Sequence, residues 1–553
     1  MIDCTLCDVA CFGVVPVFVN AGAALLPAIL AGLTSIVSLV LRPAALWRAC
    51  AAKPAAAIGV LLAVAAASAA VVWMAFSPGV ESARKRPAAR EILGARTVDW
   101  AAMADRWLMQ ENVGGGGEVA PATAEARQAV IFGGSPLRNS YAGGGSPAGL
   151  SQAWSFPAAG SKTAEEFEGA MFLASPAVVD GALYGGSCLL DMRRNYGTLF
   201  RLNARTGEEL WTTSVYRDGN GKEREFKGFF SSPAVTADGK HLVIGQGLHT
   251  DDHCELLCIN TTTGAVKWSV ATPLHIEGSP AVDGDLAVVG AGAIEEGDDH
   301  HAKGHKGLVI AVKISTGEKM WQYEVADPES SPAIKDGIVY IGSGFNGNAV
   351  VALRAEADDE LKKRGADRLL WRTPTPYPAT GAITLVDDLA IVGCGNGDYV
   401  FADPQPDGAV IALDCKTGKE RWKVRMPDGV LGKVAVFGGT AIVPVRNGEV
   451  LALDLAATPV PTVRWRQRVS GDKAILAGAA FTGKHVYAVS QDGYLAVLDA
   501  ADGKILERHY LNAKDKPGEM GLSVSSPTVA GGRVYVGSET GGLRCFAGKE
   551  VKP

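Results

Sequence analysis

Short apolar segments separated by glycine-containing turns repeat along most of this chain. From Ser175 onward, one unit reads SPAVVDG, ALYGGS, GTLFRLNA and RTGEELW. Each apolar run has the length and composition of a β-strand, and the Asp-Gly and Thr-Gly pairs supply the positive φ angles that tight turns need. The unit therefore predicts four short strands per repeat.

The opening of this unit recurs at regular intervals. It returns at Ser232-Pro233, Ser279-Pro280, Ser331-Pro332 and Ser526-Pro527, and in altered form near Ala382, Lys433 and Gly478. Successive starts lie 45 to 57 residues apart. Such a period with four strands per unit is typical of a β-propeller. We predict an all-β, eight-bladed propeller.

A tryptophan closes most of the units. These residues are Trp154, Trp211, Trp268, Trp321, Trp371, Trp422 and Trp465. A large ring at one position of every blade can pack against the neighbouring blade, so we interpret the set as structural blade-docking residues. The seventh unit has Glu507 in this position, which predicts the weakest packing at that junction.

The last unit and a segment far upstream complement each other. The unit that begins at Ser526 contains three strand patterns, whereas residues 150–156 form a lone strand pattern with Trp154. We expect strand 150–156 to complete the last blade and close the ring, because closure removes exposed sheet edges. The predicted propeller covers residues 131–548, followed by a tail, 549–553.

Two apolar runs precede the repeats. Residues 9–41 and 55–76 are each long enough for a transmembrane helix, which needs about 20 apolar residues. We predict that residues 1–78 form a membrane anchor and that 79–130 form a helical and flexible linker. The basic residues flanking the second run leave its orientation and the topology of the first run open. We expect the propeller on the extracytoplasmic side.

Composition narrows the choice of partners and cofactors. The net charge of −6 and the pI near 5.9 give no basic surface for a phosphate backbone, so we expect no nucleic acid partner. Cys4 and Cys7 form a Cys-x-x-Cys pair followed by Asp8 rather than His, which excludes a c-type haem attachment site. A zinc site would need a second ligand pair, so membrane-embedded thiols are the favoured interpretation.

The repeat units resemble a known family. LFRLNARTGEELW, VIALDCKTGKERW and LAVLDAADGK are similar to the pyrroloquinoline-quinone repeat, Ala-x-Asp-x-x-Thr-Gly-x-x-x-Trp, over about residues 131–548. Segment 132–139, FGGSPLRN, resembles the stretch before the first strand in such proteins. The family includes quinone-dependent alcohol dehydrogenases and the scaffold lipoprotein of the outer-membrane barrel assembly machinery. The resemblance implies a bacterial membrane and periplasmic location and other envelope proteins as partners.

The cofactor site of the dehydrogenases is not evident in the sequence. Those enzymes have a vicinal Cys-Cys disulfide, calcium ligands and a catalytic Asp, but no two cysteines are adjacent here and no block matches the ligands. The resemblance therefore implies the fold without the cofactor. We expect neither pyrroloquinoline quinone nor Ca²⁺.

The densest group of potential metal ligands lies in an insertion of the third unit. It contains Asp298, Asp299, His300, His301 and His305, which could bind a transition metal. A solvated loop is the favoured interpretation, because no ligand pair lies on a regular element.

Two further insertions, 246–254 and 396–399, occupy corresponding places in the second and fifth units. Insertions at equivalent turns project from one face, so this face is the candidate partner or ligand surface. Two functions follow from the sequence. The favoured one is a non-catalytic, membrane-anchored extracytoplasmic scaffold that binds proteins or envelope polymers; the alternative is a quinone- or metal-dependent oxidoreductase. Partner identity and oligomeric state stay open.

Overall fold

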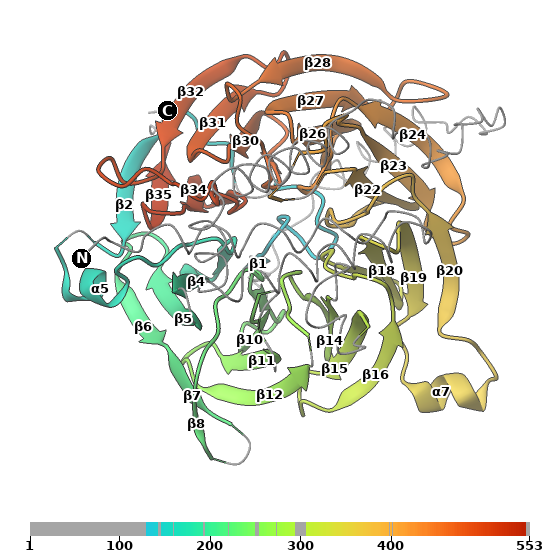
Figure 1. The fold of residues 1–553 in the computed structure, drawn as a ribbon, viewed down its shortest axis with the longest axis horizontal. Helices are drawn as coiled ribbons and strands as arrows, with labels where there is room; N and C mark the ends of the chain where they lie inside the picture. Colours follow the sequence, from blue (N-terminus) through green and yellow to red (C-terminus); the bar gives the residue numbers. More distant parts are fainter. Residues whose placement is uncertain are drawn as a thin grey trace, which may run out of the picture. The chain divides into compact units, whose positions relative to one another are not determined.

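Eight β-sheets surround a common axis in the computed structural model (Figure 1). The structure describes residues 129–548 apart from 142–144, 159, 192–193, 219–220, 249–250, 252–253, 273, 293–305, 398 and 401. The predicted all-β, eight-bladed propeller is confirmed. The apolar runs 9–41 and 55–76, the linker up to residue 128 and the tail 549–553 lie outside the described residues. Within the described part of the chain, no helix is both long and apolar enough to span a bilayer.

The first four blades follow one another along the chain. Blade 1 contains β3 (Ala177–Val179), β4 (Ala182–Asp191), β5 (Arg194–Asn203) and β6 (Glu209–Thr213), with β1 (Ala129–Val130) paired to β3. Blade 2 contains β9 (Ala234–Val235), β10 (His241–Gly245), β11 (Cys254–Asn260) and β12 (Val266–Thr272). Blade 3 contains β13 (Ala281–Asp283), β14 (Leu286–Ala291), β15 (Leu308–Lys313) and β16 (Lys319–Glu324). Blade 4 contains β17 (Ala333–Lys335), β18 (Ile338–Ser343), β19 (Ala349–Arg354) and β20 (Leu369–Pro374).

The remaining blades complete the circle. Blade 5 contains β21 (Thr384–Val386), β22 (Leu389–Gly395), β23 (Gly408–Asp414) and β24 (Glu420–Met426). Blade 6 contains β25 (Ala435–Phe437), β26 (Thr440–Val445), β27 (Glu449–Asp454) and β28 (Thr462–Arg468). Blade 7 contains β29 (Ala480–Phe481), β30 (His485–Val489), β31 (Tyr494–Asp499) and β32 (Ile505–Tyr510). Blade 8 contains β33 (Thr528–Ala530), β34 (Arg533–Gly537), β35 (Leu543–Ala547) and β2 (Ser151–Phe156).

Smaller elements decorate this ring. A hairpin of β7 (Val215–Arg217) and β8 (Glu223–Glu225) follows blade 1. Two short helices, α5 (Lys162–Glu166) and α7 (Asp358–Lys363), lie in connections. The pairing of β1 with β3 places the start of the propeller two residues before the expected boundary at residue 131.

The strands of each blade run antiparallel from the inside to the outside of the ring. The second and third strands are mainly apolar and buried at their centres, as in β14 and β15, because neighbouring blades cover both of their faces. The outer strand β16, KMWQYE, alternates exposed and buried positions, because one of its faces meets solvent. The core is therefore a series of layers between blades.

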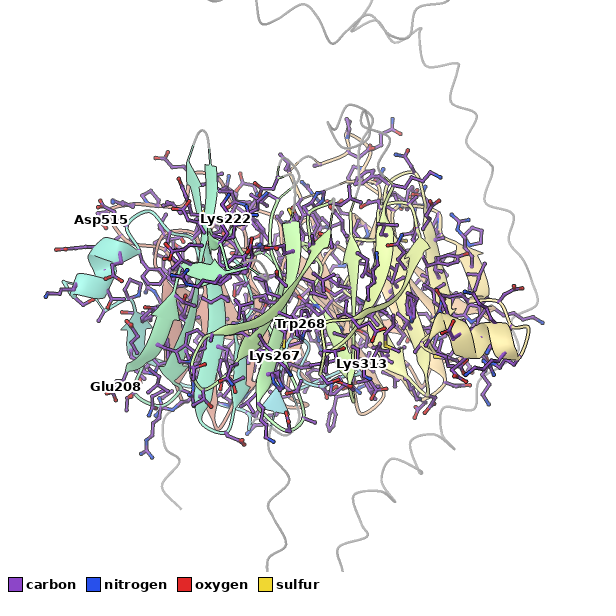
Figure 2. All side chains as sticks on the ribbon, turned by 90° about the horizontal axis from the view of Figure 1, so that it is seen from below. Glu208, Lys222, Lys267, Trp268, Lys313 and Asp515 are labelled. Atoms are coloured by element: carbon purple, nitrogen blue, oxygen red, sulfur yellow. The ribbon has the colours of Figure 1, made fainter. Side chains whose placement is uncertain are left out.

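The antiparallel order gives the ring two distinct faces. Figure 2 shows the propeller from the side, with Lys222 and Asp515 at one face and Glu208 and Lys313 at the other. The face with Lys222 and Asp515, here the loop face, carries the connections between blades and those between second and third strands. The opposite turn face carries the tight turns.

Each docking tryptophan follows a β-bulge. In blade 3, Ala311 pairs with Trp321 and Val312 with Lys319, so Met320 is the extra residue. The same register shift occurs beside Trp211, Trp268, Trp371, Trp422 and Trp465, and beside Trp154 in the closing strand. A bulge twists its strand locally and changes the direction of the adjacent side chain. In this protein the bulge stands next to an indole that packs against the next blade.

The indole rings pack on the turns of the following blades. Six of the seven Nε1 atoms donate a hydrogen bond of 2.7 to 3.2 Å to a carbonyl of the next blade. The glycine of the Thr-Gly or Asp-Gly turn lies beneath the ring. At Gly207, Gly264, Gly317, Gly418 and Gly503, a Cβ would approach an indole carbon to 2.5 to 2.9 Å. The repeat glycine is thus required for tryptophan docking as well as for its positive φ.

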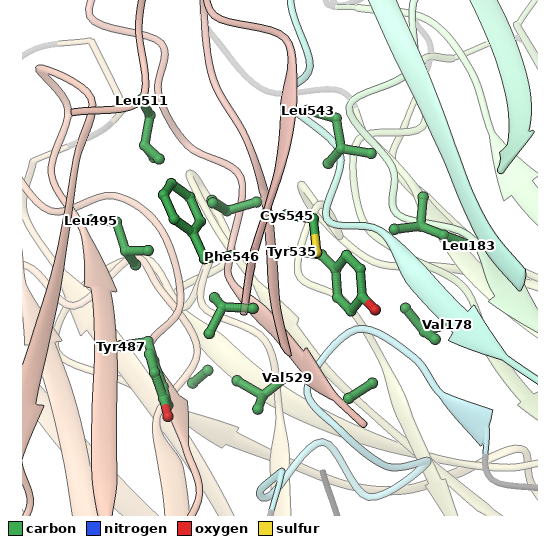
Figure 3. Packing of buried hydrophobic residues seen from close by; sticks show 14 of the residues in the cluster. Val178, Leu183, Tyr487, Leu495, Leu511, Val529, Tyr535, Leu543, Cys545 and Phe546 are labelled. Atoms are coloured by element: carbon green, nitrogen blue, oxygen red, sulfur yellow. The ribbon is translucent and has the colours of Figure 1, made fainter. Parts of the chain in front are cut away.

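Strand β2 completes the last blade, with Trp154 opposite Cys545 of β35. The junction before it, between blades 7 and 8, differs from the weak packing that Glu507 predicted. The Glu507 carboxylate accepts hydrogen bonds from the backbone N–H groups of Gly149 (2.7 Å) and Leu150 (2.8 Å). A continuous apolar cluster also joins Tyr487 of blade 7 to Phe546 of blade 8 and further residues of blade 1 (Figure 3). A carboxylate that binds the closing strand thus replaces the indole.

We predict unequal costs for removing the indole N–H from two matched tryptophans. Trp371 donates to the Cys415 carbonyl at 3.0 Å, whereas the buried Nε1 of Trp422 has no acceptor among the described residues. Trp371→Phe should therefore lower the free energy of unfolding by about 1 kcal/mol more than Trp422→Phe. Chemical denaturation of the two variants measures the difference. Equal losses would contradict the hydrogen-bonding contribution to docking.

Candidate functional site: a funnel on the propeller axis

The serines of the repeated Ser-Pro motif form a hydrogen-bonded ring around the axis. The Ser175 N–H donates to Ser232 Oγ, the Ser232 N–H to Ser279 Oγ and the Ser279 N–H to Ser331 Oγ, at 2.9 to 3.0 Å. The Ser526 N–H donates to Ser175 Oγ at 2.9 Å and so links the last blade to the first. We call these five residues the serine ring.

Three neighbouring blades interrupt the serine ring. Ala382, Lys433 and Gly478 occupy the serine position in blades 5, 6 and 7. The Gly478 N–H still donates to Ser526 Oγ at 2.9 Å. On this side of the axis, the ring therefore has two small residues and a lysine in place of three hydroxyl groups.

The segment 131–141, here the axial segment, binds to these same three blades. The N–H of Leu385 in blade 5 donates to the Leu137 carbonyl, and that of Val436 in blade 6 donates to the Asn139 carbonyl, at 2.9 and 2.8 Å. The Tyr141 N–H donates to the Phe481 carbonyl of blade 7 at 2.9 Å. The light-blue trace of the axial segment crosses the centre of the ring in Figure 1.

Arg138 of the axial segment is buried at the axis with 2% of its surface exposed. Its guanidinium donates to the carbonyls of Pro332 (2.7 Å), Ser279 (2.9 Å) and Pro280 (2.9 Å), at the starts of blades 3 and 4. Burial lowers the pKa of Arg138 to about 9, which still leaves the group charged at neutral pH. The sequence indicated only that this segment resembles the family, and the contacts of Arg138 with the starts of blades 3 and 4 were not predicted.

Lys433 is a second cation beside the axis. Its side chain is also 2% exposed, and Nζ has no hydrogen-bond partner among the described residues. The ammonium lies 5.8 Å from the centre of the Tyr141 ring. Burial, assisted by the charge of Arg138, lowers the pKa of Lys433 to about 7. The sequence showed a lysine in a serine position, but its burial was not predicted.

A funnel of about 480 Å³ opens above these groups. Its polar lining comprises the serine ring, Glu277, Glu329, Thr380 and Lys433. Its apolar lining includes Leu173, Phe230, Phe345, Leu431, Leu476, Leu522 and Val524. Tyr399 and Val400, in the insertion of blade 5, also line it. One of the three insertions predicted to share a face therefore borders the funnel.

Glu277 and Glu329 of the funnel wall form a cluster with the buried His275. Each offers one ligand atom, and these atoms lie within 4.8 Å of one another. His275 Nε2 and Glu329 Oε1 are 2.5 Å apart. A Cβ on Gly292 would approach both of these atoms to less than 3 Å, so glycine is required there. One imidazole and two carboxylates suit a divalent transition metal.

Sequence reasoning placed the metal candidates elsewhere. Asp298, Asp299, His300, His301 and His305 lie outside the described residues. The observed cluster did leave a signal in the repeat, because Glu277 and Glu329 each stand two residues before the serine of a Ser-Pro motif.

The cysteines that the structure describes offer no reactive thiol. All six are buried: Cys188, Cys254, Cys258, Cys394, Cys415 and Cys545. Burial raises the thiol pKa to about 12 for Cys258 and Cys394 and to about 11 for Cys415 and Cys545. These thiols therefore stay protonated and unreactive at neutral pH.

The described lining does not fit a calcium-bound pyrroloquinoline quinone. One cation, Lys433, lines the funnel beside Glu277 and Glu329, so most of the carboxylates of the quinone would find no matching positive charge there. None of the seven docking tryptophans belongs to the described lining, and five of them pack against a turn glycine of a neighbouring blade. Calcium prefers ligand sets made of oxygen, whereas the observed cluster includes the His275 imidazole.

We predict that Lys433→Met stabilises the protein in a pH-dependent way. Below about pH 7, Lys433 is charged in both the folded and unfolded states, so folding carries the full cost of burying it. Between about pH 7 and 10, the folded state loses this proton first, and the cost shrinks as pH rises. The free energy of unfolding of the variant should exceed that of the parent by on the order of 4 kcal/mol at about pH 6 and by far less at about pH 10.

Thermal denaturation across this pH range measures the effect. Lys416→Met, at an exposed turn position, is the matched control and should show no such pH dependence. An equal gain from Lys433→Met at both ends of the range would contradict the buried-cation interpretation.

Comparisons with known proteins agree with this fold. The family model described as outer membrane protein assembly factor BamB matches residues 195–361 and 361–550. Tetrathionate hydrolase of Acidithiobacillus ferrooxidans is 23% identical over 65% of this chain and 70% of its own length. BamB of Yersinia pestis is 21% identical over 63% of this chain and 80% of its own length.

A solved structure shows the same fold. The quinohemoprotein alcohol dehydrogenase of Comamonas testosteroni superposes with a TM-score of 0.51 at 15% identity, over 77% of this chain and 81% of that chain. The repeat resemblance is thus confirmed by an independent comparison. The chain belongs to the pyrroloquinoline-quinone-repeat β-propeller family represented by the BamB model.

Proposed function

We propose that this protein is a non-catalytic binding propeller, anchored in a bacterial membrane, that docks other envelope proteins on its loop face. The observation that carries the proposal is the apolar rim of the funnel. Leu173, Phe230, Leu431, Leu476, Leu522 and Val524 line a concave surface on the axis. Concave apolar surfaces with a few polar groups are typical of binding sites.

The exposed residues on the funnel side point to a protein ligand. Val400 is 69% exposed and Met520 is 56% exposed, and both lie in irregular connections. Large apolar side chains in contact with water favour association with another apolar surface. An extended segment of a partner could place apolar side chains in the funnel while the connections contact its flanks.

The comparisons support the envelope setting of this proposal. Assembly factors of the outer membrane are among the relatives, and the family model takes its description from them. The apolar runs 9–41 and 55–76 supply the proposed anchor, with the propeller on the periplasmic side. Catalysis has no support in the described lining beyond the His275 cluster.

A second function is favoured by that cluster. His275, Glu277 and Glu329 would hold a divalent metal ion, whose chemistry would be that of a Lewis acid or a redox centre. The chain would then be a metal-dependent oxidoreductase with the funnel as its substrate site. Metal analysis of the purified full-length protein and a dye-linked dehydrogenase assay over several alcohols and sugars test this alternative. Bound metal with turnover would replace the scaffold proposal.

Site-specific photo-crosslinking tests the scaffold proposal directly. A photoreactive residue at Val400 in the full-length chain, expressed in its native cell, should form a discrete adduct with an envelope protein. Leu506 on the outer strand β32, 43% exposed, is the control position and should give no such adduct. Adducts are identified by mass spectrometry. A cytoplasmic partner, or equal labelling from Leu506, would contradict the proposal.

A further inference from the structure

Two buried cations close to the propeller axis, Arg138 and Lys433, have no carboxylate partner among the described residues, and only Lys433 lines the funnel. Arg138 bonds three backbone carbonyls, and Lys433 Nζ bonds no acceptor. An ammonium group removed from water without a hydrogen bond is unfavourable, and buried charges are generally compensated by an opposite charge. An anion bound beside these cations would therefore be stabilised by their positive charge.

The serine ring supplies hydrogen-bond donors around the same funnel. Each Oγ of the serine ring accepts one backbone N–H bond, and no described group accepts from its O–H. All five serines line the funnel together with Lys433. A hydroxyl can rotate its hydrogen toward an oxyanion while its oxygen keeps the backbone bond. The funnel base thus combines one ammonium with several available O–H donors.

The interruption of the serine ring brings Lys433 to this position. Gly478 lies directly beside it, and a Cβ there would approach Lys433 Cβ to 2.9 Å. A larger residue at position 478 would press on the lysine stem. Lys433 can therefore line the funnel because the adjacent blade has no side chain at this point.

The lining also selects the type of anion. Glu277 and Glu329 share the funnel, and their charge disfavours a dianion such as phosphate. A monoanionic carboxylate matches a single ammonium, and the aliphatic groups of Leu431, Leu476 and Val524 favour a ligand with an apolar body.

We propose that the base of the funnel is a binding subsite for the carboxylate of an apolar ligand, held by Lys433 and the hydroxyls of the serine ring. The ligand is a small aliphatic acid or the carboxyl end of a peptide chain, since both present the same group. The subsite is independent of the proposed docking of envelope proteins, because a small acid can bind whether or not a partner covers the rim.

Calorimetric titration of the full-length chain tests the subsite with four probes. These are 4-methylpentanoate, its amide, N-acetyl-Ala-Leu with a free carboxyl group, and the same dipeptide as its amide. At least one acid should bind saturably, and each matching amide should bind at least about tenfold more weakly, because it lacks the charge. The free acid that binds more tightly identifies the source of the carboxylate.

Variants of the lysine connect binding to the subsite. Lys433→Met should weaken acid binding at least about tenfold, whereas Lys433→Arg should retain part of it and Lys416→Met all of it. Thermal denaturation confirms that each variant is folded, and Lys433→Met is expected to be more stable than the parent. Absence of binding by both acids, equal binding of acids and amides, or unchanged binding by Lys433→Met would each overturn the proposal.

Discussion

The contact between a tryptophan and the turn of the next blade sets the geometry of this protein. Five of the seven indoles rest on a glycine that has no room for a Cβ, and six of the seven donate a hydrogen bond to a nearby carbonyl. A bulge beside each tryptophan accompanies this orientation. Because this contact recurs around the ring, it supports the arrangement in which the inner strands converge on one axis. The serine ring and the funnel depend on that convergence.

The repeat made the fold predictable from sequence. Glycine turns, apolar strand runs and a tryptophan at a fixed place are local features that recur, so eight units and their strand content follow from comparing the units. The partner of strand 150–156 followed as well, because an incomplete last blade needs a fourth strand. Glu507 was interpreted less well. A missing tryptophan indicated a weak junction, yet the carboxylate binds backbone N–H groups that no pattern around Glu507 reveals.

The funnel was far less predictable, because its residues meet only after the ring has closed. Arg138 contacts carbonyls more than 140 residues away, and Lys433 lies beside Tyr141 from the opposite end of the fold. Departures from the repeat mark this site. Lys433 stands in place of a serine, and Glu277 and Glu329 precede two of the serines. Residues that preserve the repeat form the blades, whereas residues that depart from it supply the charged groups near the axis.

The pairing of β2 with β35 has a consequence for how the protein is made. Ser151 pairs with Ala547, so an early strand of the propeller must wait for almost the last residues of the domain to be synthesised. Until then β2 lacks its neighbour in the last blade. Long-range strand pairing of this kind is slow and leaves unpaired edges exposed during biosynthesis. A nascent chain of this type depends on protection from aggregation until its final blade emerges.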